Sequence, residues 1–232
     1  MPTEVESVAQ EKSSLGAPIN SQHELTFLCA YLTFLFSAQA AYAYLYVHSI
    51  FLQTTFVVPI AIRLSAWTAP VLVYLIVAKQ SLINFLKLGN ARRGVVWGVG
   101  VGFSIVLLNL VGGYVLRGHV GVNFRLPANY WFGAVVTVGL SEEVVFRGFL
   151  LSAFSCRKRF WVANLLQAAV FLAIHLTGWA LMHQFIWPNI VQQIAYVFLL
   201  GVMLGFVRYK SDSLWACMLI HSFSNFAALA VK

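Results

Sequence analysis

The segment YWFGAVVTVGLSEEVVFRGFLLSAF, residues 130–154, decides the fold class, because it is long and apolar enough to span a membrane and yet carries two adjacent acids. These acids, Glu142 and Glu143, are two of the three acidic side chains that follow residue 24. A carboxylate in hydrocarbon is unfavourable by several kcal/mol unless it is paired, hydrated or protonated. We therefore expect a functional site here, with a basic partner for the acids. The candidate partners are Arg147, His175 and His221.

The composition of the whole chain agrees with a membrane protein. Of its 232 residues, 60% are hydrophobic and 9% charged, and the mean hydropathy is +0.81. A soluble core of this size has no room for that much apolar surface, so we predict an all-α, polytopic transmembrane helical bundle. The net charge of +8 does not indicate a nucleic-acid partner, because Lys and Arg lie in short clusters between apolar runs. We expect the lipid bilayer as the surroundings and no nucleic acid.

About seven membrane spans are predicted, within a range of six to eight, because seven apolar stretches are each long enough to cross a bilayer. They are residues 25–52, 56–78, 94–116, 130–153, 160–178, 185–207 and 213–231. Basic clusters follow the second, fourth and sixth stretches, whereas the alternate loops hold only Arg117 and Arg125. By the positive-inside rule, the N-terminus is cytoplasmic and the C-terminus outside in this multi-pass integral membrane protein. In a prokaryote the membrane would be the cell membrane.

The chain is divided into a tail and one membrane domain. Residues 1–24 are polar and acidic, without the basic start and apolar core of a cleavable signal peptide, and we expect them to be disordered. Residues 25–232 are predicted to form a single integral domain, whose core at 130–231 carries the chemistry. The cysteines lack CxxC spacing and support neither a disulfide framework nor a zinc-thiolate site.

The fourth stretch places its charges at helical spacing. Residues four apart share a helix face, so Glu143 and Arg147 are predicted to form an ion pair. Glu142 lies about 100° around the helix and is expected to be left free, pointing into the bundle as a general base. The alternative is that the acids and Arg147 form a purely structural charge cluster that locks helices together.

Further polar residues are expected at the same membrane depth. His175 lies in the fifth stretch, and His221 and Asn225 share one face of the seventh. At 1.5 Å per residue, their heights and that of Glu142 differ by roughly 10 Å or less, so one water-filled cavity could hold all four side chains. Phe171 shares a face with His175.

Two other features of the spans have more than one interpretation. Arg63 lies in an apolar stretch without a local acid, and it could reach toward the interface, bind a lipid phosphate or meet a substrate carboxylate. Gly98, Gly100 and Gly102 in the third stretch are predicted to permit close helix packing.

Three segments on separate spans carry a family resemblance. SEEVVFRG (141–148), FLAIH (171–175) and HSFSN (221–225) resemble the signature motifs EExxxR, FxxxH and HxxxN of the CAAX prenyl-protease-like intramembrane protease family, also called CPBP or Abi. All three match at every defining position. The resemblance covers roughly residues 130–231, and it implies an intramembrane endopeptidase acting on prenylated CaaX sequences or other membrane-anchored peptides.

The resemblance also implies roles for individual residues. Glu142 would activate water as general base and His175 would help to hold that water, while His221 and Asn225 would stabilise the oxyanion. The residues that would support the site structurally are Glu143, Arg147 and Phe171.

Whether the site uses a metal is left open by the sequence. Glu142, His175 and His221 could bind zinc, and a zinc-bound water is the mechanistic alternative. The HExxH signature is absent and Asn is a poor zinc ligand, so we favour a glutamate-type, metal-independent protease without a cofactor.

A different class of function is a non-enzymatic membrane carrier or scaffold that uses a buried Glu/His cluster. The chain shows no duplicated halves, which many carriers have, and this makes a carrier the weaker hypothesis.

Overall fold

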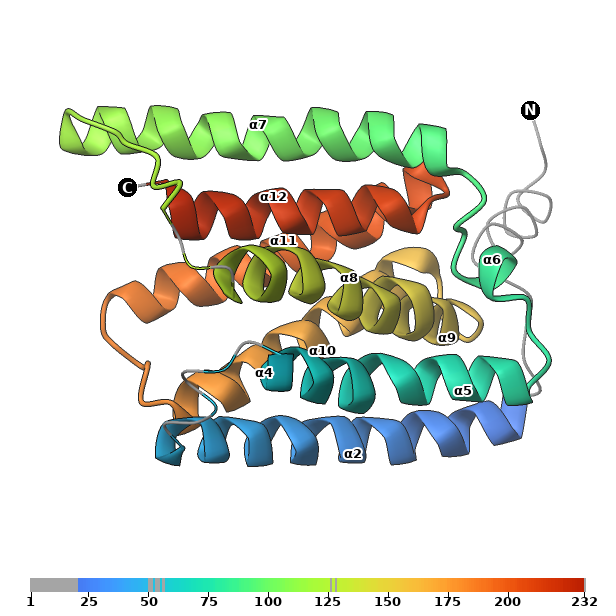
Figure 1. The fold of residues 1–232 in the computed structure, drawn as a ribbon. Helices are drawn as coiled ribbons and strands as arrows, with labels where there is room; N and C mark the ends of the chain where they lie inside the picture. Colours follow the sequence, from blue (N-terminus) through green and yellow to red (C-terminus); the bar gives the residue numbers. More distant parts are fainter. Residues whose placement is uncertain are drawn as a thin grey trace.

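The computed structural model describes residues 21–49, 52, 55, 57–125, 127 and 129–231, and this part of the chain is helical, as predicted (Figure 1). The helices, π-helical segments being marked η, are α2 (Ser21–His48), α4 (Val57–Arg63), η1 (Leu64–Thr68), α5 (Ala69–Val77), α6 (Leu82–Phe85), α7 (Ala91–Arg117), η2 (Asn129–Thr137), α8 (Val138–Glu143), η3 (Val144–Leu150), α9 (Leu151–Ser155), α10 (Phe160–Leu181), α11 (Asn189–Ser211) and α12 (Leu214–Ala230). The only pairing of extended backbone within the described residues is an isolated bridge between Val122 and Val231.

Five helices are long and apolar enough to cross a membrane, and they correspond to five of the predicted stretches. They are His23–His48, Val57–Val77, Ala91–Arg117, Phe160–Leu181 and Asn189–Ser211. The other two predicted stretches coincide with the continuous helical run of residues 129–155 and with the shorter apolar helix α12. The chain is therefore an integral membrane protein with a polytopic helical bundle.

Two helical runs contain π-helical turns. Residues 57–77 pass from α4 through η1 into α5, and residues 129–155 pass from η2 through α8 and η3 into α9. We call the second run the central rod. A π-turn inserts an extra residue into the helical repeat, which redirects the side chains around it and often marks a functional site. Arg63 ends α4 directly before η1, and Glu143 ends α8 directly before η3.

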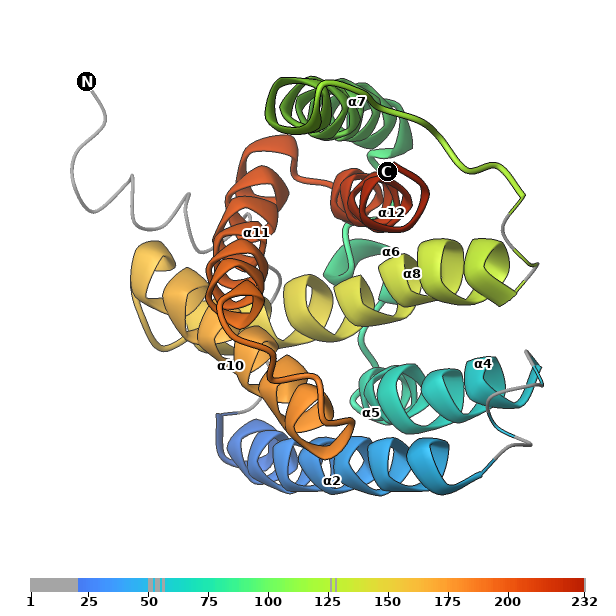
Figure 2. The same cartoon turned by 90° about the vertical axis from the view of Figure 1, so that its left-hand side faces the viewer.

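The central rod forms the core of the bundle. Figure 2 shows it crossing the middle, with α7 and α12 on one side, α4 and α5 on the other, and α10 and α11 at one end. All seven residues of η3 are buried. In contrast, α7 exposes large apolar side chains, of which Leu116 is 85% and Leu108 70% accessible. An apolar outer surface of this kind is expected where lipid rather than water surrounds a helix.

The first helix begins earlier than predicted. α2 starts at Ser21, and Glu24, placed in the tail by the sequence, is buried and forms an ion pair with Arg157 at 3.2 Å. This pair links the start of α2 to the segment that follows α9. The prediction of disorder for residues 1–20 lies outside the described residues.

Glycines bring α7 close to α12 at two of the three predicted positions. A Cβ at Gly98 would lie 2.7 Å from Cβ of Leu219, and one at Gly102 would lie 2.4 Å from a ring carbon of Phe223. Gly100 points to open space, so its predicted packing role is wrong. The reason is the helical period, because a residue two positions from Gly98 and Gly102 faces away from their common neighbour.

The basic loops lie together. The connections from α5 to α7, from α9 to α10 and from α11 to α12 are at one end of the bundle, at the right of Figure 1. The connections from α7 to the central rod and from α10 to α11 are at the opposite end (Figure 1). This arrangement agrees with alternating spans, while the orientation in the membrane stays a prediction.

Candidate active site

Glu142 is held by an arginine that the sequence analysis left without a partner. Nη1 of Arg63 lies 2.6 Å from Oε1 of Glu142, and the carboxylate is buried. The prediction that Glu142 is left free is therefore wrong. The two residues are 79 positions apart, so the contact arises only when α4 packs beside the central rod, and local spacing could not reveal it. The Arg63 guanidinium also lies 4.8 Å from the ring centroid of Trp67.

Glu143 forms the predicted ion pair with Arg147. Nη1 of Arg147 lies 2.7 Å from Oε1 of Glu143, and both side chains are completely buried. The same Oε1 atom accepts a hydrogen bond from Nδ1 of His221 at 2.7 Å. Glu143 thus contacts both Arg147 on its own helical run and His221 on α12. The motif spacing did not reveal the contact with His221.

Both histidines turn their Nε2 atoms toward Glu142. Nε2 of His175 is 4.0 Å and Nε2 of His221 is 3.9 Å from Oε2 of Glu142. These distances exceed direct hydrogen bonds, and Oε2 has no hydrogen-bonding partner among the described residues. The predicted gathering of these three side chains is present in the structure.

The opposite ring nitrogens fix the proton positions. Nδ1 of His175 lies 2.7 Å from the carbonyl oxygen of Phe171, which only accepts, so Nδ1 carries the proton. Nδ1 of His221 likewise donates to the Glu143 carboxylate. In the neutral form of each ring, Nε2 is therefore an acceptor facing Glu142.

Phe171 packs against both imidazoles. Its ring centroid is 4.6 Å from that of His175 and 5.9 Å from that of His221, in edge-to-face geometry. The Arg147 guanidinium lies 4.4 Å from the same ring centroid. This one buried aromatic residue thus contacts three of the polar side chains of the site.

Asn225 lies on α12 one turn after His221, but its side chain forms a hydrogen bond outside the group of Glu142, His175 and His221. Its Nδ2 donates to the carbonyl oxygen of Ala134 at 2.8 Å, which ties α12 to η2. An amide nitrogen carries two hydrogens, so one donor is used in helix packing and a second remains. The predicted oxyanion role of Asn225 stays a prediction.

A hydrogen-bond network next to Arg147 was not predicted from the sequence. Gln167 donates to the carbonyl oxygen of Gly201 at 2.9 Å, and Nη2 of Arg147 lies 3.3 Å from that same oxygen. Gln167 also donates to Asn164, which in turn donates to the carbonyl oxygen of Val202. The available signal was the presence of two amide side chains in an otherwise apolar span.

The three side chains that could bind zinc lie farther apart than zinc ligands do. Among the described residues, no group of three or more His, Cys, Asp or Glu side chains is spaced to hold a metal ion. Ligands at zinc bond lengths would lie roughly 3.4 Å apart, which is less than the distances of 3.9 and 4.0 Å from Oε2 of Glu142 to the two Nε2 atoms. The side chains as they stand are therefore spaced more widely than zinc ligands.

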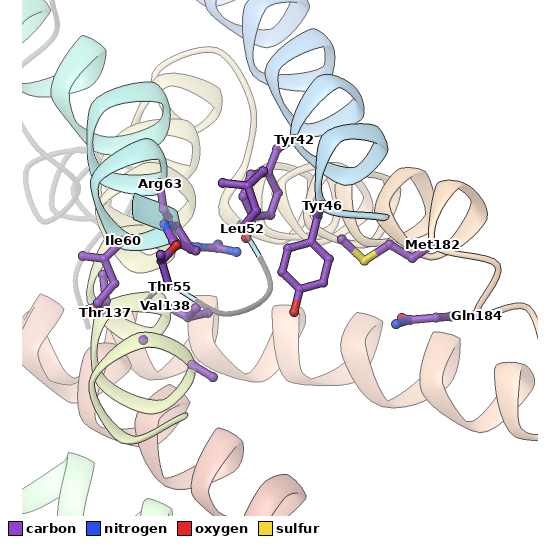
Figure 3. A pocket seen from close by; sticks show the side chains of 13 residues that line it. Tyr42, Tyr46, Leu52, Thr55, Ile60, Arg63, Thr137, Val138, Met182 and Gln184 are labelled. Atoms are coloured by element: carbon purple, nitrogen blue, oxygen red, sulfur yellow. The ribbon is translucent and has the colours of Figure 1, made fainter. Parts of the chain in front are cut away.

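A cavity of about 340 Å³ is lined by Arg63 (Figure 3). Its lining also includes Met182 and Gln184, which follow α10 at the end of the bundle away from the basic loops (Figure 1). Arg63 points into the cavity, and Thr137 and Val138 line it one turn before Glu142. The cavity thus leads to the arginine that holds Glu142. Its full lining consists of Tyr42, Tyr46, Leu52, Thr55, Pro59, Ile60, Arg63, Gly133, Ala134, Thr137, Val138, Met182 and Gln184.

Comparison with protein families finds a match in the segment that carries most of these side chains. Residues 124–227 match the family model for the type II CAAX prenyl endopeptidase, Rce1-like. This segment of the chain is similar to the CAAX prenyl endopeptidase family. The match contains Glu142, His175, His221 and Asn225 but not Arg63. No curated protein and no solved structure gave a significant match.

The matched family is one of CAAX-type endopeptidases that act on prenylated protein substrates in membranes. The bundle of apolar helices agrees with such a protease of the bilayer.

Proposed function

We propose that this chain is a CAAX-type endopeptidase and a glutamate protease, in which Glu142 activates a water molecule to cut a membrane-anchored or prenylated peptide. One observation carries the proposal, namely that Oε2 of Glu142 faces Nε2 of both His175 and His221 at about 4 Å. A single water molecule at ordinary hydrogen-bond distance, about 2.8 Å, can bridge two acceptors with this separation.

In the proposed step, the water donates one hydrogen to Oε2 of Glu142 and the other to Nε2 of His175. Glu142 takes the first proton as the water oxygen attacks the scissile carbonyl carbon and forms a tetrahedral intermediate. The proton then passes from Glu142 to the peptide nitrogen. The C–N bond breaks, and the products are a new amine and a new carboxylic acid, which keeps the second hydrogen of the water.

Arg63 acts as a positioning residue for this carboxylate. It engages Oε1 at 2.6 Å and leaves Oε2 for the water. It also supplies a positive charge that offsets the cost of burying the Glu142 carboxylate, which is a role that a motif search within residues 124–227 would miss.

His221 is proposed to stabilise the oxyanion. Glu143 accepts from its Nδ1, so a hydrogen on Nε2 would make this ring a donor to the oxyanion of the substrate. The second hydrogen of the Asn225 amide is a further donor. Removing one such donor typically lowers kcat by about 10²- to 10³-fold.

The cavity of Figure 3 is the proposed approach of the peptide. Its lining combines aliphatic side chains with Tyr42 and Tyr46, which suits an extended peptide with apolar residues. Because the cavity ends at Arg63, a peptide within it would lie beside Glu142.

The test is cleavage of a panel of prenylated and membrane-anchored peptides by purified wild type and Glu142→Gln, each with and without a strong chelator. We expect the variant to be inactive and the wild type to resist the chelator. Glu24→Gln is a matched control, because it removes a buried, arginine-paired acid at the start of α2.

Three outcomes would contradict parts of the proposal. Full activity of Glu142→Gln would remove the assigned base. Inhibition by the chelator, reversed by zinc, would make the protein a metalloprotease. No cleavage by wild type, together with unchanged stability of Glu142→Gln, would favour the carrier or scaffold hypothesis.

A further inference from the structure

Two adjoining cavities lie on α10 and α11, away from the candidate active site. One has a volume of about 350 Å³ and is lined by Arg159, Phe160, Trp161, Phe206, Tyr209 and Lys210. The other, of about 530 Å³, is an apolar groove lined by Ile105, Trp161, Tyr196, Leu199, Leu200, Val202, Met203 and Phe206. Trp161 and Phe206 belong to both, so the basic cavity and the apolar groove adjoin at these two side chains.

Aromatic stacking gives the basic cavity defined walls. The rings of Trp161 and Phe206 are stacked at 5.8 Å, and those of Phe160 and Tyr209 at 4.4 Å. Nζ of Lys210 lies 5.6 Å from the ring centroids of both Phe206 and Tyr209. The ammonium group is thus held beside this aromatic pair by cation–π attraction.

The charges of this cavity are suited to an anion. Arg159 and Lys210 are exposed, and neither cavity lining includes an acidic side chain. The known hydrogen bonds at both positions involve backbone carbonyl oxygens, which accept from the amide of Ala163 and from Arg93 respectively. Both side chains are exposed, and neither forms an ion pair with another of the described residues.

The groove continues from the charged end along the span. Arg159 precedes α10 and Lys210 lies one residue before the end of α11, whereas the groove extends back along α11 to Tyr196. Ten residues separate Tyr196 from Phe206, which is about 15 Å along a helix. The Tyr196 hydroxyl is hydrogen bonded to Ser224 at 2.7 Å, so it is the ring that lines the groove.

We propose that these cavities form one binding site for an anionic phospholipid. The headgroup phosphate binds between Arg159 and Lys210, and an acyl chain lies in the groove beneath Trp161 and Phe206. Basic pockets between membrane helices on the cytoplasmic side are suited to anionic headgroups, and the predicted orientation places this end of the bundle there. The site shares no residue with the proposed catalytic group and does not depend on the proposed reaction.

The test is lipid binding by the purified full chain, measured by native mass spectrometry while phosphatidylglycerol or phosphatidylcholine with identical acyl chains is titrated. We expect wild type to retain phosphatidylglycerol preferentially. In Arg159→Gln/Lys210→Gln, phosphatidylglycerol binding should weaken by about thirtyfold, toward the level of phosphatidylcholine. The backbone hydrogen bonds at both positions remain available, so the variant is expected to fold, and thermal unfolding checks this.

Matched controls separate a defined site from general surface charge. Lys79→Gln/Arg92→Gln removes two charges from the same end of the bundle but outside both cavities, and should keep the preference. Leu199→Trp should reduce binding of both lipids by filling the groove. Equal binding of the two lipids by wild type, equal losses in the two double variants, or displacement of the lipid by glycerol 3-phosphate alone would each overturn the proposal.

Discussion

The guanidinium of Arg63 lies 2.6 Å from one oxygen of Glu142, and the other oxygen of that carboxylate faces two imidazoles. The two residues come from different helical runs, and each run passes into a π-helical segment close by. Because a π-turn redirects the neighbouring side chains, the contact occurs where both runs depart from regular α-helical geometry. The pair therefore fixes the carboxylate that we propose as the base.

Replacing Arg63 by Ala removes the hydrogen bond that orients Glu142. A hydrogen bond to a charged group contributes about 1.5–3 kcal/mol. We therefore expect kcat for peptide cleavage to fall by roughly 10- to 100-fold, with partial recovery in Arg63→Lys because the positive charge is kept. Cleavage assays on the purified protein measure this. Arg92→Ala, an exposed arginine at the basic end, should leave kcat unchanged, and a fully active Arg63→Ala would remove Arg63 from the mechanism.

Helix geometry explains which parts of the site were predictable from the sequence. Glu143 and Arg147 are one turn apart on one helix, so their ion pair followed from spacing alone. The gathering of His175 and His221 near Glu142 followed from comparing depths along separate spans. These inferences need only the rise of a helix and the thickness of a bilayer.

Contacts set by packing between helices were not predictable in this way. The sequence places no acid near Arg63, and nothing local indicates that α4 lies against the central rod. The link from Glu143 to His221 and the hydrogen bond from Asn225 to Ala134 likewise depend on how α12 is rotated. The prediction for Gly100 was wrong for the same reason. The sequence shows three glycines, but it does not show which face of α7 packs against α12.

Breaking the buried Glu143–Arg147 pair should destabilise the bundle. Arg147→Met leaves the Glu143 carboxylate with His221 alone, and removing one partner of a buried pair typically costs about 3–5 kcal/mol. We expect a clearly lower unfolding temperature in detergent, followed by tryptophan fluorescence. The double variant Glu143→Gln/Arg147→Met should be more stable than Arg147→Met, because no uncompensated charge remains. If the double variant loses the sum of both single effects, the two residues do not act as a pair.

Close packing of α7 on α12 gives a prediction with a control in the same helix. Gly98→Ala and Gly102→Ala place a methyl group against Leu219 and Phe223, and such overpacking typically costs about 1–3 kcal/mol. Gly100→Ala adds the same methyl group where nothing lies within 4 Å. Thermal unfolding should therefore show lower stability for the first two variants and no loss for the third. Equal behaviour of all three would contradict the packing of α7 against α12.

The clustering of basic loops predicts the orientation of the bundle in the membrane. In a variant whose native cysteines are replaced by serine, a single cysteine at Arg92 should be protected from an impermeant thiol reagent added to intact cells, and one at Arg125 should react. The two positions lie at opposite ends of the bundle, so each serves as the control for the other. Permeabilising the cells should make the Arg92 cysteine reactive as well. The reverse labelling pattern would place the basic loops outside, and the proposed anionic-lipid site would then face the outer leaflet.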